Sequence, residues 1–373
     1  MVGALLFMTN KKIIIAGGGT GGHLFPALAI GEEIIRRNPN TKVHYIGSIF
    51  GLESKVYPIK DVWHTLLPIR GLQRGFGLTS IARNLLLPFR IVISIIKINK
   101  LLKEFVPEII IATGGYAAAI PLLVISKIYK DLPIVLQEQN SFPGLTTKWF
   151  SGRAQKICVA FDEPLKTLGT NTILTGNPVR KAISKGNRNN GIKKFNFNKN
   201  KKTIFLFGGS QGSSYLNKIM SEVVKNISNA GHQILWQTGD LEYSQYRFMN
   251  SENIRVVPFI NNMADAYAIS DLIVCRSGAL TLAEITVCGK PSILIPFSNA
   301  AGNHQTKNAE ALVKMGAARV LFEKSLVPKI MIHTIMNLIH NNKKLANMSK
   351  ASKALGKPNA TIKIVDLITL VEP

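Results

Sequence analysis

The chain has 373 residues, of which 46% are hydrophobic and 18% are charged, and its formal net charge at pH 7 is +25. This length exceeds what one hydrophobic core usually organises, so two domains are expected, and the composition excludes a disordered chain. The three cysteines are too few and too scattered for a disulfide framework or a zinc cluster, which favours a reducing compartment. The excess of positive charge fits either an anionic partner or a drift of the composition toward Lys, Asn and Ile.

Neither a secretory signal nor a membrane span is evident in the sequence. The first residues, MVGALLFMTNKK, lack an early positive charge and a long apolar core. No stretch reaches the roughly 18 to 20 uninterrupted apolar residues that a spanning helix needs. The sequence therefore predicts a soluble or peripheral protein.

The first half of the chain alternates short β-branched runs with helical stretches, notably the helices 24–37 and 80–105. This alternation predicts a parallel sheet with helices on both faces. The predicted strands are 11–17, 42–47, 108–113, 133–139 and 156–161.

The polar, asparagine-rich stretch 185–202 interrupts this pattern, which then restarts with a strand, a glycine loop and a helix over 203–226. We therefore expect two similar α/β domains with a boundary near 178–202. The further predicted strands are 232–238, 254–259, 271–277 and 291–297.

The first glycine loop, AGGGTGGHLFPALAI, follows the first strand. Gly17, Gly19 and Gly22 match G-x-G-x-x-G, in which glycines let the backbone approach a ligand and the helix N-terminus faces an anion. A nicotinamide-binding unit should also carry an acid at the end of its second strand. Here that strand ends at Ser48 and the next acid is Glu53, so an oxidoreductase is less favoured.

A second candidate nucleotide site is CRSGALTLAE, 275–284, where a helix is expected to begin near Gly278 or Ala279. A diphosphate could bind the N–H groups of Ala279, Leu280 and Thr281. Two interpretations of Glu284 stay open: it accepts hydrogen bonds from both hydroxyls of a ribose, or it is an ordinary first-turn glutamate favoured by the helix dipole.

His23 directly follows the first glycine loop. It is either a structural residue that caps the turn or a general base, since a neutral imidazole accepts a proton near pH 7. No His–His or Cys–His spacing suits a metal, and no D-x-D is present to hold one against a diphosphate. The prediction is a site with no metal and no cofactor.

Several further motifs occur in one order along the chain and, together with the first glycine loop, resemble the MurG family of bacterial glycosyltransferases over roughly residues 11–365. They are GGYAAAIP (114–121), EQNSFPGLTTKW (138–149), TGNPVR (175–180), FGGSQGSSYLN (207–217), PFINNMADAYAISDLIVCRSGALTLAE (258–284) and NHQTKNA (303–309).

The resemblance implies the α/β GT-B fold, in which two Rossmann-like domains with parallel sheets face each other across a cleft. An acceptor and membrane-facing domain is expected over 10–178 and a UDP-GlcNAc-binding domain over 179–355. A C-terminal helix within 356–373 is expected to return to the N-terminal domain.

The implied activity is that of an inverting hexosyltransferase in peptidoglycan synthesis, hence in cell-wall biogenesis, cell shape and cell division. It moves N-acetylglucosamine from UDP-GlcNAc to the 4-hydroxyl of N-acetylmuramyl-pentapeptide in undecaprenyl-diphosphate-linked lipid I, giving lipid II. The implied location is peripheral, on the cytoplasmic face of the bacterial inner membrane. An anionic membrane surface and the cell-wall synthesis machinery are implied partners, and no nucleic acid is expected.

Site roles are carried over onto matching positions. In the N-terminal half, Thr20, Gly21 and Gly22 should line the donor sugar and the acceptor diphosphate, and Asn140 should bind the GlcNAc. His23 is our choice of catalytic base, with Glu138 as the alternative. The remaining donor-site residues lie in the second half and are Arg180, Ser210, Ile260, Ala279, Leu280, Thr281, Leu282, Ala283, Glu284 and Gln305.

The stretch 78–105 is densely apolar but carries five cations, with Pro88 expected to interrupt its helix. Five cations make a membrane span improbable, whereas an apolar patch rimmed by cations suits an anionic lipid interface. The alternative is a core helix whose charges face water, and part of the stretch could serve each purpose.

Three rival functions are weighed against lipid II synthesis. Another GT-B enzyme, such as a lipid glycosyltransferase or a UDP-GlcNAc epimerase, would share the nucleotide half but not GGTGGH, GGY and EQN. A basic nucleic-acid or membrane-binding protein is disfavoured because no aromatic-basic RNA motif appears. The oxidoreductase fails on the missing ribose acid.

Overall fold

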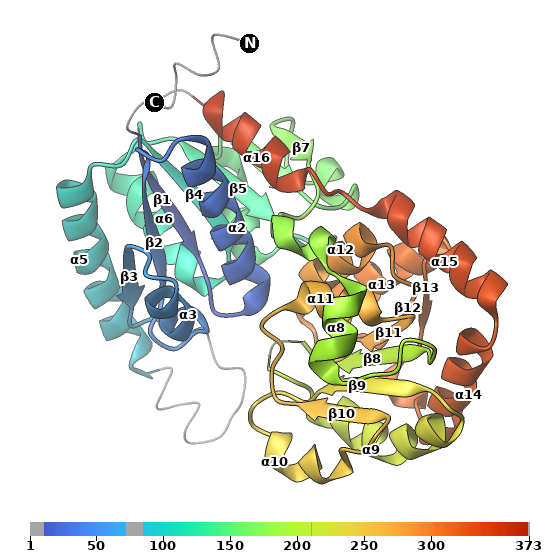
Figure 1. Ribbon diagram of the computed structural model, residues 1–373. Helices are drawn as coiled ribbons and strands as arrows, with labels where there is room; N and C mark the ends of the chain where they lie inside the picture. Colours follow the sequence, from blue (N-terminus) through green and yellow to red (C-terminus); the bar gives the residue numbers. More distant parts are fainter. Residues whose placement is uncertain (1–10, 72–84, 210, 372–373) are drawn as a thin grey trace. The chain divides into compact units, whose positions relative to one another are not determined.

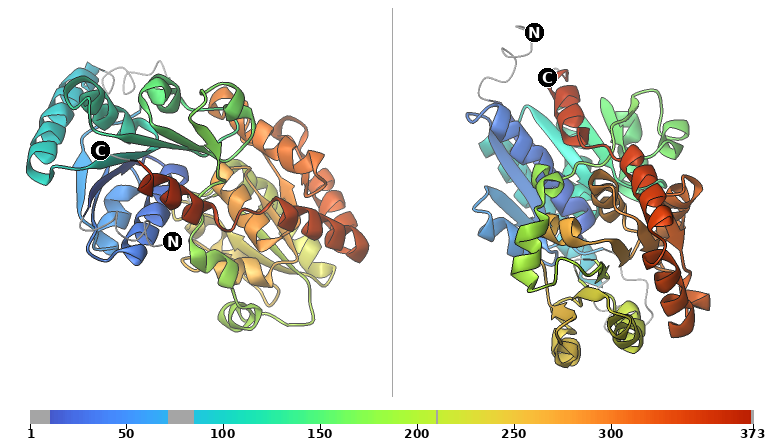
Figure 2. Two further views of the ribbon diagram at one scale, coloured as in Figure 1. Left: turned by 90° about the horizontal axis from the view of Figure 1, so that it is seen from above. Right: turned by 45° about the vertical axis from the view of Figure 1, so that its right-hand side comes forward.

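The computed structural model describes residues 11–71, 85–209 and 211–371, and the chain divides into two compact units. The N-terminal unit comprises Met1–Val179 together with Asn359–Pro373, and the C-terminal unit comprises Arg180–Pro358. Each unit is a parallel sheet with helices on both faces (Figures 1 and 2).

The sheet of the N-terminal unit has seven strands in the order β3-β2-β1-β4-β5-β6-β7, and every pair is parallel. The order reverses between β1 and β4, and ligands bind doubly wound sheets at the carboxyl ends of the strands near such a switch point. The strands are β1 (Lys12–Gly17), β2 (Lys42–Ser48), β3 (His64–Leu67), β4 (Ile109–Gly114), β5 (Ile134–Glu138), β6 (Lys156–Val159) and β7 (Thr172–Leu174).

Two hydrophobic clusters cover the two faces of this sheet. In β1, Ile13 and Ile15 belong to one cluster and Ile14 and Ala16 to the other, which is why the strand reads as a continuous apolar run. The helices are α2 (Gly21–Arg37), α3 (Glu53–Ile59), α5 (Leu87–Phe105), α6 (Tyr116–Ile128), α7 (Leu145–Phe150) and α16 (Ala360–Thr369), with 3₁₀ turns η1 (Ser151–Arg153) and η2 (Glu163–Lys166).

The last helix, α16, packs on α2 in the N-terminal unit. Ile364, Val365 and Ile368 are buried in the same cluster as the apolar face of α2. An ion pair joins Arg37 Nη1 to Asp366 Oδ1 at 2.6 Å. The C-terminal segment of the chain therefore completes the hydrophobic core of the N-terminal unit.

The C-terminal unit has a six-stranded parallel sheet in the order β10-β9-β8-β11-β12-β13. Its strands are β8 (Thr203–Phe207), β9 (Gln233–Gln237), β10 (Ile254–Val257), β11 (Leu272–Cys275), β12 (Ser292–Leu294) and β13 (Ala318–Val320). Its helices are α8 (Arg188–Phe195), α9 (Ser214–Asn229), α10 (Tyr243–Tyr246), α11 (Met263–Ile269), α12 (Ala279–Cys288), α13 (His304–Lys314), α14 (Pro328–Ile339) and α15 (Asn342–Leu355), with 3₁₀ turns η3 (Lys181–Lys185), η4 (Arg247–Met249), η5 (Ala301–Asn303) and η6 (Glu323–Ser325).

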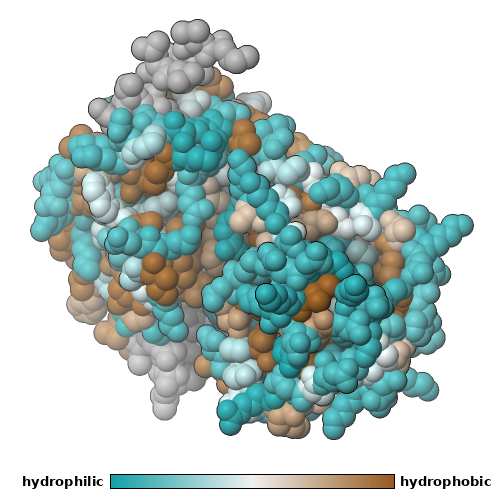
Figure 3. Space-filling view, viewed as in Figure 1, coloured by the Kyte–Doolittle hydropathy of each residue, from teal (hydrophilic) through white to brown (hydrophobic). Residues whose placement is uncertain are grey.

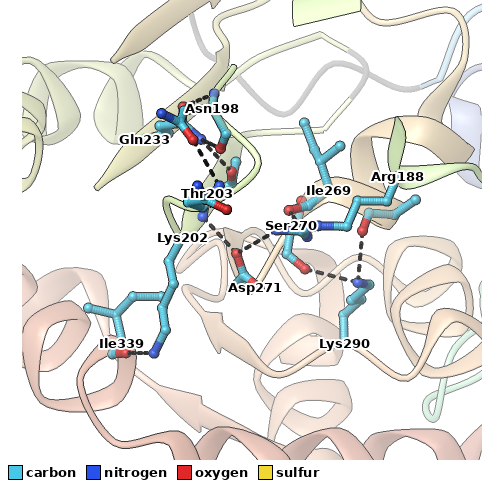
Figure 4. Close-up of polar contacts among 12 residues, drawn as sticks. Arg188, Asn198, Lys202, Thr203, Gln233, Ile269, Ser270, Asp271, Lys290 and Ile339 are labelled. Carbon is cyan, nitrogen blue, oxygen red and sulfur yellow. Dashed lines mark hydrogen bonds and ion pairs between the residues drawn. The ribbon is translucent and has the colours of Figure 1, made fainter. Parts of the chain in front are cut away.

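Polar contacts organise the amino-terminal edge of this second sheet (Figure 4). The Thr203 N–H donates to Asp271 Oδ2 at 2.8 Å, and Arg188 lies 3.7 Å from the same carboxylate. Lys290 Nζ donates to the Ser270 carbonyl at 2.9 Å. These side chains form hydrogen bonds with backbone groups at the amino-terminal edge of the sheet and have a structural role. The glycine motifs follow the opposite, carboxyl-terminal edge.

The structure refines the expectations from the sequence at three places. Leu86 forms a turn between helical Leu85 and the start of α5 at Leu87, so Pro88 stands in the first turn of α5, where its missing N–H costs nothing; residues 80–84 of the expected helix lie outside the described residues. The stretch 185–202 contains a helix, α8, because the Asn187 side chain caps it and Phe195 buries its end. Three short strands were not predicted, namely β3, β7 and β13, each at the edge of a sheet.

Candidate functional site

The first glycine loop connects β1 to α2 in a conformation that requires glycine. Gly19 has φ +92°, and a Cβ there would lie 2.5 Å from the Tyr116 ring. The exposed Thr20 precedes α2, and the backbone ladder begins with His23 N–H donating to the Thr20 carbonyl at 3.2 Å. The N–H groups of Gly21 and Gly22 therefore lie before the ladder, where a helix start can meet an anion.

A buried carboxylate, Glu53, holds this loop in place. The Gly19 N–H donates to both of its oxygens at 2.9 Å, and the Ser48 N–H donates to Oε1 at 2.8 Å. A Cβ on Gly18 would lie 2.2 Å from the same carboxylate. Glu53 is thus a structural carboxylate that binds the backbone of the glycine loop. Sequence reasoning missed this role because it asked only whether this acid could bind a ribose.

His23 has its imidazole fixed by the neighbouring strand β4. Nδ1 lies 2.8 Å from the Thr113 carbonyl oxygen, and Thr113 Oγ1 donates to the His23 carbonyl at 2.8 Å. A carbonyl can only accept, so Nδ1 carries the hydrogen and the neutral ring has its lone pair on Nε2. Gly114 has φ +90°, and a Cβ there would lie 3.2 Å from the imidazole. This tautomer is the one that a general base acting through Nε2 requires.

Glu138, at the end of β5, is buried with both oxygens engaged. Oε1 accepts from the Asn140 N–H at 3.0 Å and from Asn140 Nδ2 at 3.3 Å. Oε2 accepts from the Gly144 N–H at 2.9 Å and from the Thr147 hydroxyl at 2.6 Å. This carboxylate shapes the loop that presents Asn140, whose side chain is half-buried.

In the C-terminal unit, α12 begins at Ala279 after Gly278, as the sequence predicted. Its first intrahelical bond runs from the Leu282 N–H to the Gly278 carbonyl at 3.0 Å. The N–H groups of 279–281 therefore lie at the positive end of the helix dipole, and the first turn carries no acidic residue.

Glu284 lies further along α12, inside the unit, so it is not a first-turn glutamate. Its Oε2 accepts from the Tyr267 hydroxyl at 2.8 Å, and its Oε1 is 3.9 Å from Arg180 Nη2. Burial raises the pKa of the Glu284 carboxyl, although the Arg180 charge and the Tyr267 hydroxyl act in the opposite direction. A buried carboxylate with so few donors has acceptor capacity left for hydroxyl groups.

Two more elements converge on the same carboxyl-terminal edge. The Ile260 N–H donates to Gln237 Oε1 at 2.9 Å, and Gln237 Nε2 donates to the Gly209 carbonyl at 3.1 Å. The buried Gln237 therefore connects the second glycine loop to Ile260, a link that no motif signalled. Ser210 lies outside the described residues.

Gln305 lies beside the start of α12. Its carbonyl accepts from the Ser277 hydroxyl at 2.8 Å, and its side-chain Oε1 accepts from the Phe297 N–H at 3.0 Å. The neighbouring Arg276 is buried and pairs with Glu323 at 2.5 Å, so this arginine of the CRSGALT motif is structural.

The structure thus brings several of the predicted residues close to one another in each unit. Thr20, Gly21, Gly22 and His23 lie on one loop and helix start, and Glu138 with Asn140 follows a neighbouring part of the sheet. In the other unit Arg180 and Glu284 lie together, and Gln305 adjoins the residue before Gly278. Within the described residues no group of three or more His, Cys, Asp or Glu side chains is arranged to hold a metal ion.

Comparison with known proteins matches both halves of the chain to one enzyme class. Residues 13–159 match the glycosyltransferase family 28 N-terminal domain, and residues 203–364 match the C-terminal domain. The chain is 38% identical over 371 residues to the "UDP-N-acetylglucosamine--N-acetylmuramyl-(pentapeptide) pyrophosphoryl-undecaprenol N-acetylglucosamine transferase" of Flavobacterium psychrophilum, covering 98% of this chain and 99% of that one. The transferase of the same name from Acetivibrio thermocellus is 35% identical, covering 96% and 97%.

Solved structures give the same answer for the fold. The crystal structure of Acinetobacter baumannii MurG superposes with a TM-score of 0.73 at 25% identity, covering 97% of this chain and 100% of that one. A putative UDP-N-acetylglucosamine 2-epimerase from Listeria monocytogenes shares the fold alone, with a TM-score of 0.69 at 14% identity over 96% of each chain.

Two Rossmann-like units with parallel sheets and both family 28 domains define a GT-B glycosyltransferase, a hexosyltransferase as the sequence predicted. The chain belongs to the MurG family. In the part of the chain that the structure describes, none of the helices has the length and apolar character to cross a bilayer.

Proposed function

We propose that this enzyme transfers N-acetylglucosamine from UDP-GlcNAc to the 4-hydroxyl of N-acetylmuramyl-pentapeptide in lipid I, giving lipid II for peptidoglycan synthesis. The observation that carries the proposal is the 38% and 35% sequence identity, over 98% and 96% of this chain, to the two transferases named above. The alternative, another lipid glycosyltransferase or an epimerase, is not favoured, since the epimerase neighbour shares the fold at only 14% identity.

We assign the donor nucleotide to the C-terminal unit. The N–H groups of Ala279, Leu280 and Thr281 would bind the diphosphate at the start of α12, with Leu282 and Ala283 behind them, and Ser210 would add a hydroxyl. Glu284 would accept hydrogen bonds from the ribose hydroxyls, because its carboxylate is buried and incompletely satisfied.

The uracil and the sugar would be recognised by groups beside that helix. The Ile260 N–H is engaged by Gln237, so the Ile260 carbonyl is the backbone atom that would accept a hydrogen bond from the uracil. Gln305 would contact the GlcNAc, and Arg180 would stabilise the charge that develops on the departing diphosphate.

We assign the acceptor and the proton transfer to the N-terminal unit. Thr20, Gly21 and Gly22 would line the sugar and diphosphate groups, and Asn140 would bind the GlcNAc. His23 Nε2 would take the proton of the 4-hydroxyl as that oxygen attacks C1 of GlcNAc and the bond from C1 to the UDP oxygen breaks. One direct displacement of this kind inverts C1 and leaves UDP as the second product.

His23 is preferred to Glu138 as the base because of their hydrogen bonds. The Glu138 oxygens already accept from four groups of their own loop, which suits a residue that orients Asn140. His23 instead has its Nδ1 hydrogen engaged and its lone pair on Nε2. Helix N-termini and Arg180 supply the charge stabilisation, so we propose no metal and no cofactor.

Helix α5 supports a peripheral membrane location. One of its faces packs on the sheet through Ile98 and Leu102, while the other is exposed and apolar. Apolar patches reach the surface among hydrophilic residues on the side where α5 lies (Figure 3). The exposed apolar residues of α5 are Phe89, Val92, Ile93 and Ile96, and Leu85 and Leu86 directly before the helix are exposed as well.

Exposed Lys97, Lys100 and Lys103 follow on the same helix. We propose that this surface docks on anionic lipid at the cytoplasmic face of the bacterial inner membrane, where lipid I would be met. Cell-wall synthesis proteins would be neighbours there. The +25 charge of the chain would add long-range attraction to such a surface.

The function is tested by giving the enzyme UDP-[¹⁴C]GlcNAc in three separate reactions: with a short-chain lipid I analogue, with diacylglycerol, and without an acceptor. We expect label only in the lipid I analogue, with UDP released in equal amount. Label in diacylglycerol, or conversion of UDP-GlcNAc to its 2-epimer without acceptor, would overturn the proposal in favour of the alternative.

A further inference from the structure

We propose that Gln139 is a positioning residue for the base: its side-chain amide fixes the Thr113 carbonyl that holds His23 and limits how strongly that carbonyl favours the protonated ring. This inference rests on the proposed function, because it assumes that His23 accepts the proton of the acceptor hydroxyl. It adds a residue that acts through His23 without touching a substrate.

The Thr113 carbonyl oxygen accepts two hydrogen bonds within the N-terminal unit. His23 Nδ1 donates at 2.8 Å and Gln139 Nε2 donates at 2.6 Å. Thr113 is fully buried and Gln139 nearly so. Because a carbonyl oxygen has two lone pairs, these two donors use its full accepting capacity.

The backbone around this carbonyl needs such support. Gly114 and Gly115 follow Thr113 directly, with φ of +90° and +77°. Two glycines in succession leave the peptide plane free to rotate unless other contacts hold it. The amide of Gln139, the residue directly after β5, supplies such a contact, so the acceptor of the His23 ring stays in one orientation.

The orientation of the Gln139 amide is itself determined by its surroundings. Nε2 faces the Thr113 carbonyl, the Gln137 carbonyl at 3.2 Å and the Gln137 side-chain oxygen. Gln137 Nε2 donates to Asn177 Oδ1 at 3.1 Å, and Asn177 Nδ2 donates to the Gln139 carbonyl at 3.0 Å, which closes the ring of hydrogen bonds. A reversed Gln139 amide would set its oxygen against three others, so only one orientation is compatible with this closed, buried ring.

His23 Nδ1 and Gln139 Nε2 compete for the Thr113 carbonyl oxygen, so the Gln139 amide affects how strongly that oxygen binds the His23 ring. When His23 takes up a proton, its Nδ1–H becomes a stronger donor to the Thr113 carbonyl. Without Gln139, that carbonyl would accept from His23 alone and would stabilise the charged ring more. In the wild-type arrangement the Gln139 donor therefore limits how much the Thr113 carbonyl stabilises the charged ring.

The test compares Gln139→Leu with wild type and with Gln233→Leu, a matched control. Gln233 is an equally buried glutamine whose amide donates to the Asn198 carbonyl and to Thr203 in the other unit. For Gln139→Leu we expect kcat to fall about 10-fold while KM for UDP-GlcNAc changes less than about 3-fold. The acid limb of the kcat profile should move up by roughly half a pH unit. For Gln233→Leu the limb should not move.

Two further measurements keep the proposal open to refutation. In the double variant His23→Ala with Gln139→Leu the rate should fall no further than in His23→Ala alone, since both act through one group. If Gln139→Leu does not fold, Gln139→Met keeps the length of the side chain but removes the donor, and the ¹⁵N shifts of His23 should then show that the imidazole no longer holds a single tautomer.

The role of Gln139 would be overturned by any of three results: an acid limb that does not move in Gln139→Leu, a His23 tautomer that does not change in the Gln139 variant, or rate losses that multiply in the double variant. Full activity of His23→Ala would instead overturn the proposed base. The two failures are therefore distinguishable.

Discussion

The two units treat their buried carboxylates differently. Glu53 and Glu138 in the N-terminal unit and Glu284 in the C-terminal unit are all less than 10% exposed. Glu53 accepts from two backbone N–H groups, and Glu138 accepts from three N–H donors and a hydroxyl. Glu284 has one hydroxyl donor and an arginine at 3.9 Å.

Burial alone therefore does not distinguish these three carboxylates, whereas the number of donors around each of them does. Glu53 and Glu138 hold loops of the N-terminal unit, whereas the His23 imidazole has only its Nδ1 hydrogen engaged by Thr113 and carries its lone pair on Nε2. The carboxylate of the C-terminal unit keeps accepting capacity, which a pair of ribose hydroxyls would use.

The largest effect should follow removal of the base. His23→Ala should lower kcat by about 10²- to 10⁴-fold with KM for UDP-GlcNAc nearly unchanged, because general-base catalysis contributes on that order. Steady-state transfer to a lipid I analogue measures both constants. His333→Ala, at an exposed position on α14, is the matched control and should behave as wild type.

The next largest effect should be on the binding of the donor, UDP-GlcNAc. Glu284→Gln should raise KM for UDP-GlcNAc about 10- to 100-fold, since hydrogen bonds to a charged group contribute about 1.5–3 kcal/mol each. Calorimetry with UDP and 2′-deoxy-UDP sharpens this: wild type should prefer UDP, and the variant should lose that preference. A preference retained by the variant would remove Glu284 from the ribose site. Glu252→Gln, at an exposed side chain, is the control.

A smaller effect, on stability instead of affinity, is expected at Glu53, the carboxylate that holds the first glycine loop. Glu53→Gln places an amide N–H₂ where two N–H donors converge and should destabilise the N-terminal unit by about 1–3 kcal/mol. Denaturant unfolding measures this, and KM for UDP-GlcNAc should not change. Unchanged stability would show that the carboxylate is not what holds the glycine loop.

The smallest effect should be a pH dependence of the ligand-free enzyme. Burial raises the pKa of Glu284 above its unfolded value, so its contribution to stability is present at low pH and is lost as pH rises through the folded pKa. Glu284→Gln cannot ionise, so its stability relative to wild type should improve as pH rises from 4 toward 8. Thermal unfolding across that range measures the difference, and a difference that shrinks with rising pH would contradict the assignment.

Sequence reasoning anticipated the fold class because buried parallel strands read as apolar runs, as Ile13–Ile15 in β1 do. It missed the edge strands β3 and β7, which are short and only partly buried. It found the start of α12 from Gly278 and the strand before it.

The partners of the site residues could not be predicted in the same way. Gln139 lies 26 positions from Thr113, and Glu53 lies 34 from Gly19, so no local pattern joins them. Such contacts depend on how neighbouring strands are ordered in the sheet, which the spacing of motifs leaves undetermined. The motifs located the loops, and the structure supplies the hydrogen bonds that orient them.

The central claim is that proton transfer depends on the N-terminal unit and donor binding on the C-terminal unit. It is tested most directly by single-turnover transfer of [¹⁴C]GlcNAc from saturating UDP-GlcNAc to a short-chain lipid I analogue, in EDTA, for wild type, His23→Ala and Glu284→Gln. We expect product from wild type, a transfer rate lowered at least about 100-fold in His23→Ala, and a rate near wild type in Glu284→Gln once UDP-GlcNAc is saturating. A His23→Ala enzyme that transfers at the wild-type rate, or a wild type that binds UDP-GlcNAc and forms no product, would contradict it.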